Sequence, residues 1–290
     1  MQKEIHQQNS LWWDAFRRLK KDKLAVFCFI IISGYILLAL LCLFDVAFPS
    51  YATSFDLFPN HPPNSQFLAG TDYLGRDVLA RAAHGTLTSL TVGFWGTGIA
   101  IVIGTLLGSF AGYFGGWIDE LIVWFYTTID TIPYILLVSA LSFVLGPSLF
   151  TLCVAIGITS WVSLCRIVRG EVIKHRDREY VQAAASLGAS HFRRIFRHIL
   201  PNIFHLILIK FSLGFVTTIK SEVILSFLGL GVEPGTPSWG VMINDSKQNL
   251  LAGYWWEITT ATVFMFVLVL AFNLFNDSLR DALDPKLKNK

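Results

Sequence analysis

The segment EYVQAAASLGASHFRRIFRHILPN, residues 179–202, lies between two long apolar runs and indicates how the rest of the chain is organised. Its first part predicts a short helix, because small or apolar residues recur on one face at helical spacing: Tyr180, Ala183, Ala184 and Leu187. Gly188 is expected to end this helix in a left-handed conformation. The small side chains would let a groove of another protein close over the helix backbone. The alternative is a helix that lies on a membrane surface, with its apolar face among the headgroups.

A second helix is expected after Gly188, because the hydroxyl of Ser190 can cap its first turn. One side of this helix would be apolar, with Phe192, Ile195, Phe196 and Ile199. The other side would be basic, with Arg193, Arg194, Arg197 and His198. Pro201 suits the first turn of the helix that follows, where its missing N–H costs no hydrogen bond.

The composition is that of a membrane protein. Of the 290 residues, 53% are hydrophobic and 15% are charged, whereas soluble domains average about 25% charged residues. The four cysteines are not paired as CxxC and the seven histidines are scattered, so we expect neither a disulfide framework nor a metal site. A cleavable signal peptide is not expected, because a long polar stretch precedes the first apolar run.

Six apolar runs are each long enough to cross a hydrocarbon core about 30 Å thick. They are residues 24–44, 89–112, 121–145, 149–165, 203–228 and 258–275. Within the second run, Gly104, Gly108 and Gly112 recur at every fourth position and predict a close crossing with another helix.

The lysines and arginines predict which segments face the cytoplasm. Of the 23, 18 lie in residues 1–23, in the loop 166–200 and in the C-terminal tail, whereas 3 lie in the opposite segments, 45–88 and 229–257. The remaining two, Lys210 and Lys220, fall within the fifth run. This imbalance predicts that both termini and the loop are cytoplasmic and that the two opposite segments are periplasmic.

These assignments divide the chain into expected domains. Residues 1–23, which include Trp12, Trp13 and Phe16, would lie at the cytoplasmic membrane surface. Residues 89–278 would form the core of the membrane domain, and residues 279–290 a cytoplasmic tail.

Little in the sequence indicates catalysis. The stretch GTDYLGRD, residues 70–77, is only superficially like a phosphate-binding loop, because Arg76 and Asp77 stand where such a loop needs Lys and then Ser or Thr. A nucleophile–base pattern and a metalloprotease pattern are both absent from the sequence. We therefore expect no catalytic residues in this chain.

Asp130 and Glu222 are the candidates for residues that face a solute path, because an ionisable group in a membrane run needs water or a partner. The alternative for Asp130 is a local bond to a threonine hydroxyl. Lys210 and Lys220 are expected to extend toward the lipid headgroups.

Several stretches together resemble the inner-membrane permease subunits of bacterial ABC importers, in the branch that serves dipeptides, oligopeptides and nickel. They are SLWWDAFRRLKKDKLAVF (10–27), GTDYLGRDVLARAAHG (70–85), SFLGLGVEPGTPSWGVMI (226–243) and AFNLFNDSLRDALDPKL (271–287). Residues 179–201 resemble the cytoplasmic coupling motif of that family, with Gln182 in place of the motif's Glu.

The resemblance implies an all-α, multi-pass protein of the cytoplasmic (inner) membrane, with six transmembrane helices and the type I ABC importer permease fold. A homologous second permease, two cytoplasmic ATPases and an external solute-binding protein would be its partners, besides membrane lipid, and nucleic acid would not. ATP and Mg²⁺ would be used by the ATPases, and this chain would hold no cofactor or metal. The residues that dock in the ATPase would be Tyr180, Ala183, Ala184, Leu187 and Gly188.

Two functions remain open beside a peptide permease. Within the same family, the solute could be nickel or another small molecule. From another class, an ion-coupled secondary transporter would use Asp130 or Glu222 as a proton site and would need no ATPase.

Overall fold

The computed structural model describes residues 17–49, 51–54 and 59–283, and in these residues every regular element is a helix. The expected surface residues Trp12, Trp13 and Phe16 lie outside the described part of the chain. The helices are α2 (Lys23–Leu43), α3 (Val78–Phe114), α4 (Gly116–Asp130), α5 (Tyr134–Leu145), α6 (Leu149–Thr159), α7 (Val162–Arg176), α8 (Glu179–Ser186), α9 (His191–Arg193), the π-helix η1 (Arg194–Ile199), α10 (Leu200–Phe227), α11 (Trp239–Leu251) and α12 (Trp256–Leu283). The all-α prediction is confirmed.

Four helical segments are long and apolar enough to cross a membrane, and six if each of two bent pairs counts as one span. The four are α2, α3, α12 and the continuous stretch from α9 through α10. The bent pairs are α4 with α5, at 87°, and α6 with α7, at 41°. Six crossings therefore remain a prediction.

The third expected run is not one continuous helix. Pro133 has no N–H to donate and disfavours a helical conformation in the residue before it, so α4 ends at Asp130 and α5 begins at Tyr134. The fourth run bends at Ser160, whose hydroxyl donates to the Ile156 carbonyl at 2.7 Å.

The helix α3 begins well before the expected residue 89. Asp77 caps it, because its side chain accepts from the backbone N–H groups of Leu79 and Ala80. The first turns carry polar residues such as Arg81 and His84, which concealed the helix from a search for apolar runs. The stretch 78–88 is therefore helical, in contrast to the expected external segment of residues 45–88.

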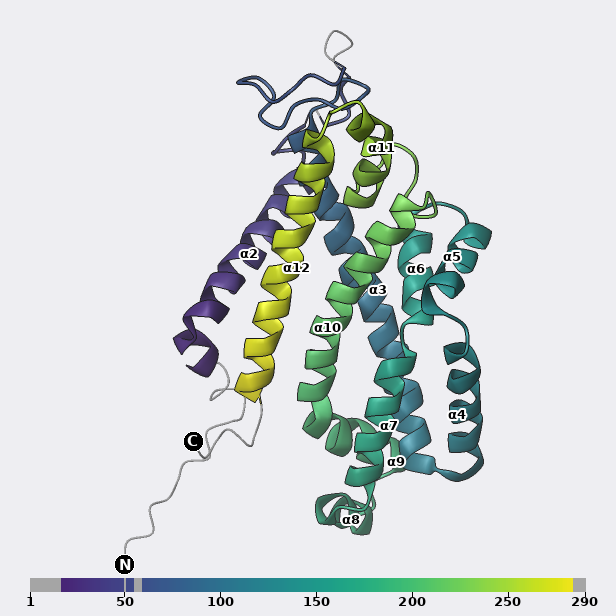
Figure 1. Ribbon diagram of the computed structural model, residues 1–290. Coiled ribbons are helices and arrows are strands. Elements are labelled where there is room, and N and C mark those ends of the chain that lie inside the picture. The colour runs from purple at the N-terminus through teal and green to yellow at the C-terminus, as the bar shows by residue number, and fades with distance from the viewer. Residues whose placement is uncertain (1–16, 50, 55–58, 284–290) are drawn as a thin grey trace, which may run out of the picture.

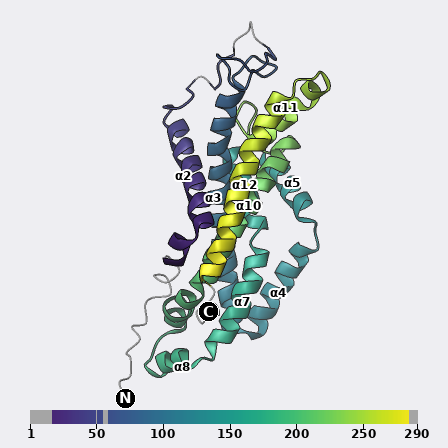
Figure 2. The same cartoon turned by 60° about the vertical axis from the view of Figure 1, so that its left-hand side comes forward.

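Different helices lie at the two ends of the molecule (Figure 1). The helix α8 lies at the same end as the start of α2 and the end of α12, and both views agree on this (Figure 2). Ser278 donates to Asp22 at 2.7 Å, which joins α12 to the cap of α2 there. The helix α11 and the segment before α3 lie at the opposite end.

The helix α3 is central and contacts α2, α6, α7, α10 and α12. Its glycines allow the closest of these contacts, which is with α7. A Cβ atom added at Gly104, Gly108 or Gly112 would lie 2.8, 2.6 or 2.6 Å from the backbone oxygen of Trp161, Cys165 or Arg169, respectively. The predicted close crossing of this glycine face is confirmed, and α7 is its partner.

Gly108→Ala is expected to lower the free energy of unfolding by about 1–3 kcal/mol, because a backbone oxygen cannot move away as a side chain could. Thermal unfolding of the purified protein in detergent would measure the loss. Gly98→Ala is the matched control on the same helix, since a Cβ there meets nothing within 4 Å. Equal stability of the two variants would contradict the tight α3–α7 contact.

Candidate functional site

The helix α8 forms where the sequence predicts it and ends at the expected glycine. Gly188 has a φ of 81°, in the left-handed region that favours glycine. Its N–H donates to the Ala185 carbonyl at 2.9 Å, and the Ala189 N–H donates to the Ala184 carbonyl at 3.0 Å. The chain therefore turns sharply after α8 and presents this turn at the end of the molecule (Figure 1).

The faces of α8 differ from the expectation at one residue. Val181 and Ala184 are 2% and 8% exposed and face the body of the chain, where Val181 packs with residues of α7 and η1. Leu187 is 89% exposed, and Tyr180, Ala183 and Gly188 are also exposed. The assignment of Ala184 to an outward docking face is thus wrong. The reason is that Val181, which the pattern omitted, anchors the helix and turns Ala184 inward with it.

Hydrogen bonds hold α8 against the end of α7. The Tyr180 hydroxyl lies 2.8 Å from Nδ1 of His175. Burial raises the pKa of Tyr180 above its ordinary value. Gln182 donates from its amide to the Asp177 carbonyl at 3.1 Å, a bond that a glutamate could not donate. Gln182 therefore stabilises the connection between α7 and α8.

The second helix of the loop is α9 continued by η1. Ser190 caps it as expected and accepts from the Arg193 N–H at 3.4 Å. Of its four apolar residues, Ile195 and Ile199 are buried, whereas Phe192 and Phe196 are 61% and 43% exposed. The helix continues from α9 as a π-helical turn over Arg194–Ile199.

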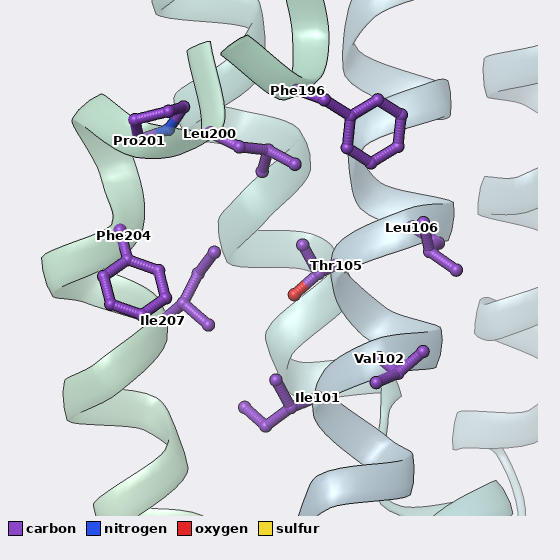
Figure 3. A pocket seen from close by; sticks show the side chains of 9 residues that line it. All are labelled: Ile101, Val102, Thr105, Leu106, Phe196, Leu200, Pro201, Phe204 and Ile207. Atoms are coloured by element: carbon purple, nitrogen blue, oxygen red, sulfur yellow. The ribbon is translucent and has the colours of Figure 1, made fainter. Parts of the chain in front are cut away.

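Phe196 borders an apolar groove of about 730 Å³ (Figure 3). Its lining comes from α3 on one side and from η1 and α10 on the other: Ile101, Val102, Thr105, Leu106, Phe196, Leu200, Pro201, Phe204 and Ile207. Thr105 contributes the only hydroxyl among these side chains. Such a lining suits hydrocarbon chains or an apolar helix and is unsuited to a polar solute.

Asp130 is the last residue of α4, beside the break at Pro133. Its carboxylate accepts from Arg166 of α7 at 2.7 Å, and both side chains are about half exposed, at 50% and 45%. The alternative of a local threonine bond is wrong, because Thr128 and Thr131 donate to backbone carbonyls. The pair is exposed at the surface of α4 and α7.

Glu222 is fully buried and does not face an open surface. Its carboxylate accepts from Ser89 at 3.1 Å, Ser226 at 2.8 Å and Ser238 at 2.6 Å. Ser238 also caps α11, so the carboxylate joins α3, α10 and α11. Its selection as a pathway residue is therefore corrected: the serines enclose it and leave it a role in holding these helices together.

A polar groove beside α10 was not predicted from the sequence. It has a volume of about 240 Å³ and opens between α3, the break of α6 and α7, and α10. Its polar side chains are those of Thr97, Ser160, Ser163, Lys210, Thr217 and Thr218. We call it the α10 groove. A lysine costs about 2.5–3.5 kcal/mol at the centre of a membrane helix, so its presence here favours contact with water.

The sequence feature that could have indicated this groove is the spacing of residues along α10. Lys210, Leu213, Thr217 and Lys220 follow one another at intervals of three or four residues and share one exposed or partly exposed face. Tyr134, at the start of α5, connects the groove to its surroundings. Its hydroxyl donates to Ser221 at 3.2 Å and lies 3.2 Å from the hydroxyl oxygen of Ser160.

A buried ion-pair network lies at the end of the molecule that holds α11. Arg81 donates to Asp72 at 2.6 Å, to Glu257 at 3.1 Å and to Asp245 at 3.4 Å. Arg76 adds a second bond to Asp72, at 2.7 Å. Burial raises the pKa of Asp245, and the charge of Arg81 opposes this shift.

The network explains the stretch GTDYLGRD. Asp72 accepts from the backbone N–H groups of Leu74 and Arg76, so the turn closes on its own carboxylate. A Cβ atom at Gly70 would lie 2.9 Å from the ring of Trp256, which leaves room only for glycine. The stretch thereby ties the start of α3 to α11 and α12.

Two family models match the sequence. Residues 104–289 match the model described as binding-protein-dependent transport system inner membrane component. Residues 10–74 match the N-terminal TM domain of oligopeptide transport permease C. The two matches together extend over most of the chain.

Characterised relatives are similar along nearly the same length. The dipeptide transport system permease protein DppC of Bacillus subtilis is 40% identical over 95% of this chain and 86% of its own. The oligopeptide transport system permease protein OppC of the same organism is 38% identical, over 96% and 91%. The glutathione transport system permease protein GsiD of Pectobacterium atrosepticum is 38% identical, over 79% and 76%.

One solved structure has a similar fold. A chain in the crystal structure of an amino acid ABC transporter superposes with a TM-score of 0.51 at 19% identity. The match covers 68% of this chain and 91% of that one. The helical arrangement of this chain is thus similar to that of the matched chain.

Proposed function

Because this chain belongs to the family of binding-protein-dependent transport system inner membrane components, we propose that it forms half of the path through which an ABC importer carries peptides. The family and the apolar helices make it a multi-pass protein of the inner membrane. The peptide substrate is supported by relatives whose names specify dipeptides, oligopeptides and glutathione, which is itself a peptide. Nickel or another small solute is the alternative within the family.

The observation that carries the proposal is the exposed turn after α8. Leu187 is 89% exposed although it is apolar. Tyr180, Ala183 and Gly188 surround it on the outer side of α8. An exposed leucine on a helix anchored by Val181 is what a groove in another protein can bind without unfolding this one. We infer that an ATPase subunit binds here.

The remaining partners follow from the family. A binding-protein-dependent system includes an external solute-binding protein, and ATP hydrolysis in two separate subunits would supply the energy. The second half of the path would come from a homologous permease. ATP and Mg²⁺ would bind to the ATPases, with no catalysis or cofactor in this chain. The distribution of 18 basic residues against 3 supports an orientation with α8 in the cytoplasm.

The test is reconstitution of the chain with the permease, ATPases and binding protein encoded by neighbouring genes. Proteoliposomes are expected to take up the dipeptide Ala-Phe only when ATP is enclosed with the ATPases. Vesicles with a catalytically inactive ATPase are the control. Uptake driven by a proton gradient, without any ATPase, would instead support the ion-coupled transporter. ATP-dependent uptake of nickel but not of peptide would retain the importer and replace its substrate.

A further inference from the structure

Two lysines on α10 lie within a segment that is long and apolar enough to span a membrane. Among the described residues, no carboxylate pairs with Lys210 or Lys220. The two acids predicted within the membrane runs have other partners, since Asp130 binds Arg166 and Glu222 accepts from serines. An unpaired ammonium group within a membrane-spanning helix needs contact with water or with an anion. The described residues of this chain supply no such anion.

The surroundings of the lysines are polar. Lys210 lines the α10 groove together with the hydroxyls of Ser160, Ser163 and Thr217. Lys220 is exposed on the same face of α10, three residues after Thr217. The apolar groove of Figure 3 and the α10 groove are lined by different residues, and only Ile101 lines both. The α10 face thus differs from the surface that suits hydrocarbon.

The two lysines follow each other along the axis of the molecule. At about 1.5 Å of rise per residue, their side chains start about 15 Å apart. Because α10 runs from the α8 end toward α11, Lys220 lies nearer the α11 end and Lys210 nearer the α8 end (Figure 1). An extended dipeptide is only about 7 Å long. One carboxylate would therefore reach the lysines in succession and not together.

We propose that Lys220 and then Lys210 bind the C-terminal carboxylate of the peptide as it moves along α10. The inference rests on the proposed peptide import. A carboxylate is the anion that peptides of every sequence share, so an ammonium group can recognise it without selecting side chains. Charge-assisted bonds from ammonium to carboxylate are among the stronger hydrogen bonds in proteins. Hydroxyls of the α10 groove would replace part of the water around the peptide.

Cysteine substitution tests both the access and the charge. Lys210→Cys and Lys220→Cys would be reconstituted with the partner subunits and treated with membrane-impermeant methanethiosulfonates on both sides of the bilayer. One reagent attaches a trimethylammonium group and the other a sulfonate. Lys247→Cys is the matched control, because this lysine is exposed but lies on α11 and not on α10. The four native cysteines are buried and provide the background.

We expect ATP-dependent uptake of Ala-Phe to fall about tenfold in Lys210→Cys and in Lys220→Cys. The trimethylammonium reagent should restore part of the uptake, because it returns the positive charge without an N–H to donate, and the sulfonate should not. Excess Ala-Phe should slow the modification more than its C-terminal amide does. Lys247→Cys should react without a change in uptake.

Three results would overturn the inference while wild-type uptake of Ala-Phe remains intact. If neither cysteine reacts, the side chains face lipid. If both react but uptake does not depend on the attached charge, or if the peptide and its amide protect equally, the lysines do not bind the carboxylate. If the variants no longer co-purify with the second permease, the lysines pair with that subunit instead. A wild-type complex that transports no peptide would refute the proposed function itself.

Discussion

Leu187→Asp is expected to weaken the binding of the ATPase subunit about 10- to 100-fold and to abolish most peptide-stimulated ATP hydrolysis. Burying a leucine contributes about 1.5–3 kcal/mol, and this contribution would be lost from the contact. The side chain is 89% exposed in the isolated chain, so its replacement removes almost no internal packing. Co-purification of the ATPase with the permease, followed by ATPase assays in lipid vesicles, would measure both effects.

Leu251→Asp is the matched control for this experiment. Leu251 is 91% exposed at the end of α11, which lies at the opposite end of the molecule from α8. The same loss of a surface leucine should leave ATPase binding unchanged there. Equal loss in the two variants would indicate a general effect on the membrane domain, and no loss in Leu187→Asp would refute the docking role of this turn.

Arg81→Met is expected to destabilise the protein by about 3–5 kcal/mol, which corresponds to a Tm lowered by roughly 10 °C. Removing this guanidinium leaves Asp72 and Glu257 buried with less compensation for their charges, at 0% and 2% exposure. The cost arises from the unpaired acids, because a buried ion pair is worth less than the penalty of breaking it. Thermal unfolding in detergent would report the change.

Two further variants separate this cause from a simple loss of packing. Arg76→Met removes a guanidinium from the same network, but Arg76 contacts Asp72 nearer the surface, so the expected loss is smaller. Adding Glu257→Met to Arg81→Met should recover part of the stability, because it removes one of the unpaired acids. Strictly additive losses in the double variant would contradict the electrostatic explanation.

The predictions that depended on short stretches of sequence agree with the structure. Gly188 ends α8 in a left-handed conformation, which glycine can adopt because it has no Cβ atom. Regularly spaced glycines indicated a close crossing, since the absence of a side chain at Gly108 permits backbone contact whatever the partner is. Pro133 was visible in the third run, but the 87° bend that it accompanies could not be read from composition.

The errors at the candidate site arose where distant segments meet. The inward position of Ala184 depends on Val181 packing with residues of α7 and η1. Glu222 looked like an ionisable group in need of a water-lined path. Its actual partners include Ser89 and Ser238, which are remote from it in sequence.

The sequence by itself determined the class of the protein, namely a helical membrane protein with an exposed loop helix and a glycine-lined crossing. Apolar length, helical periodicity and glycine conformation are local properties, and they act wherever the neighbouring segments lie. Only the tertiary structure decided which polar groups have hydrogen-bond partners in the interior and which have no partner within the described residues. It enclosed Glu222 with hydroxyls and left Lys210 and Lys220 without an acid among the described residues. The reason is that the state of a buried charge depends on the groups brought to it by other helices.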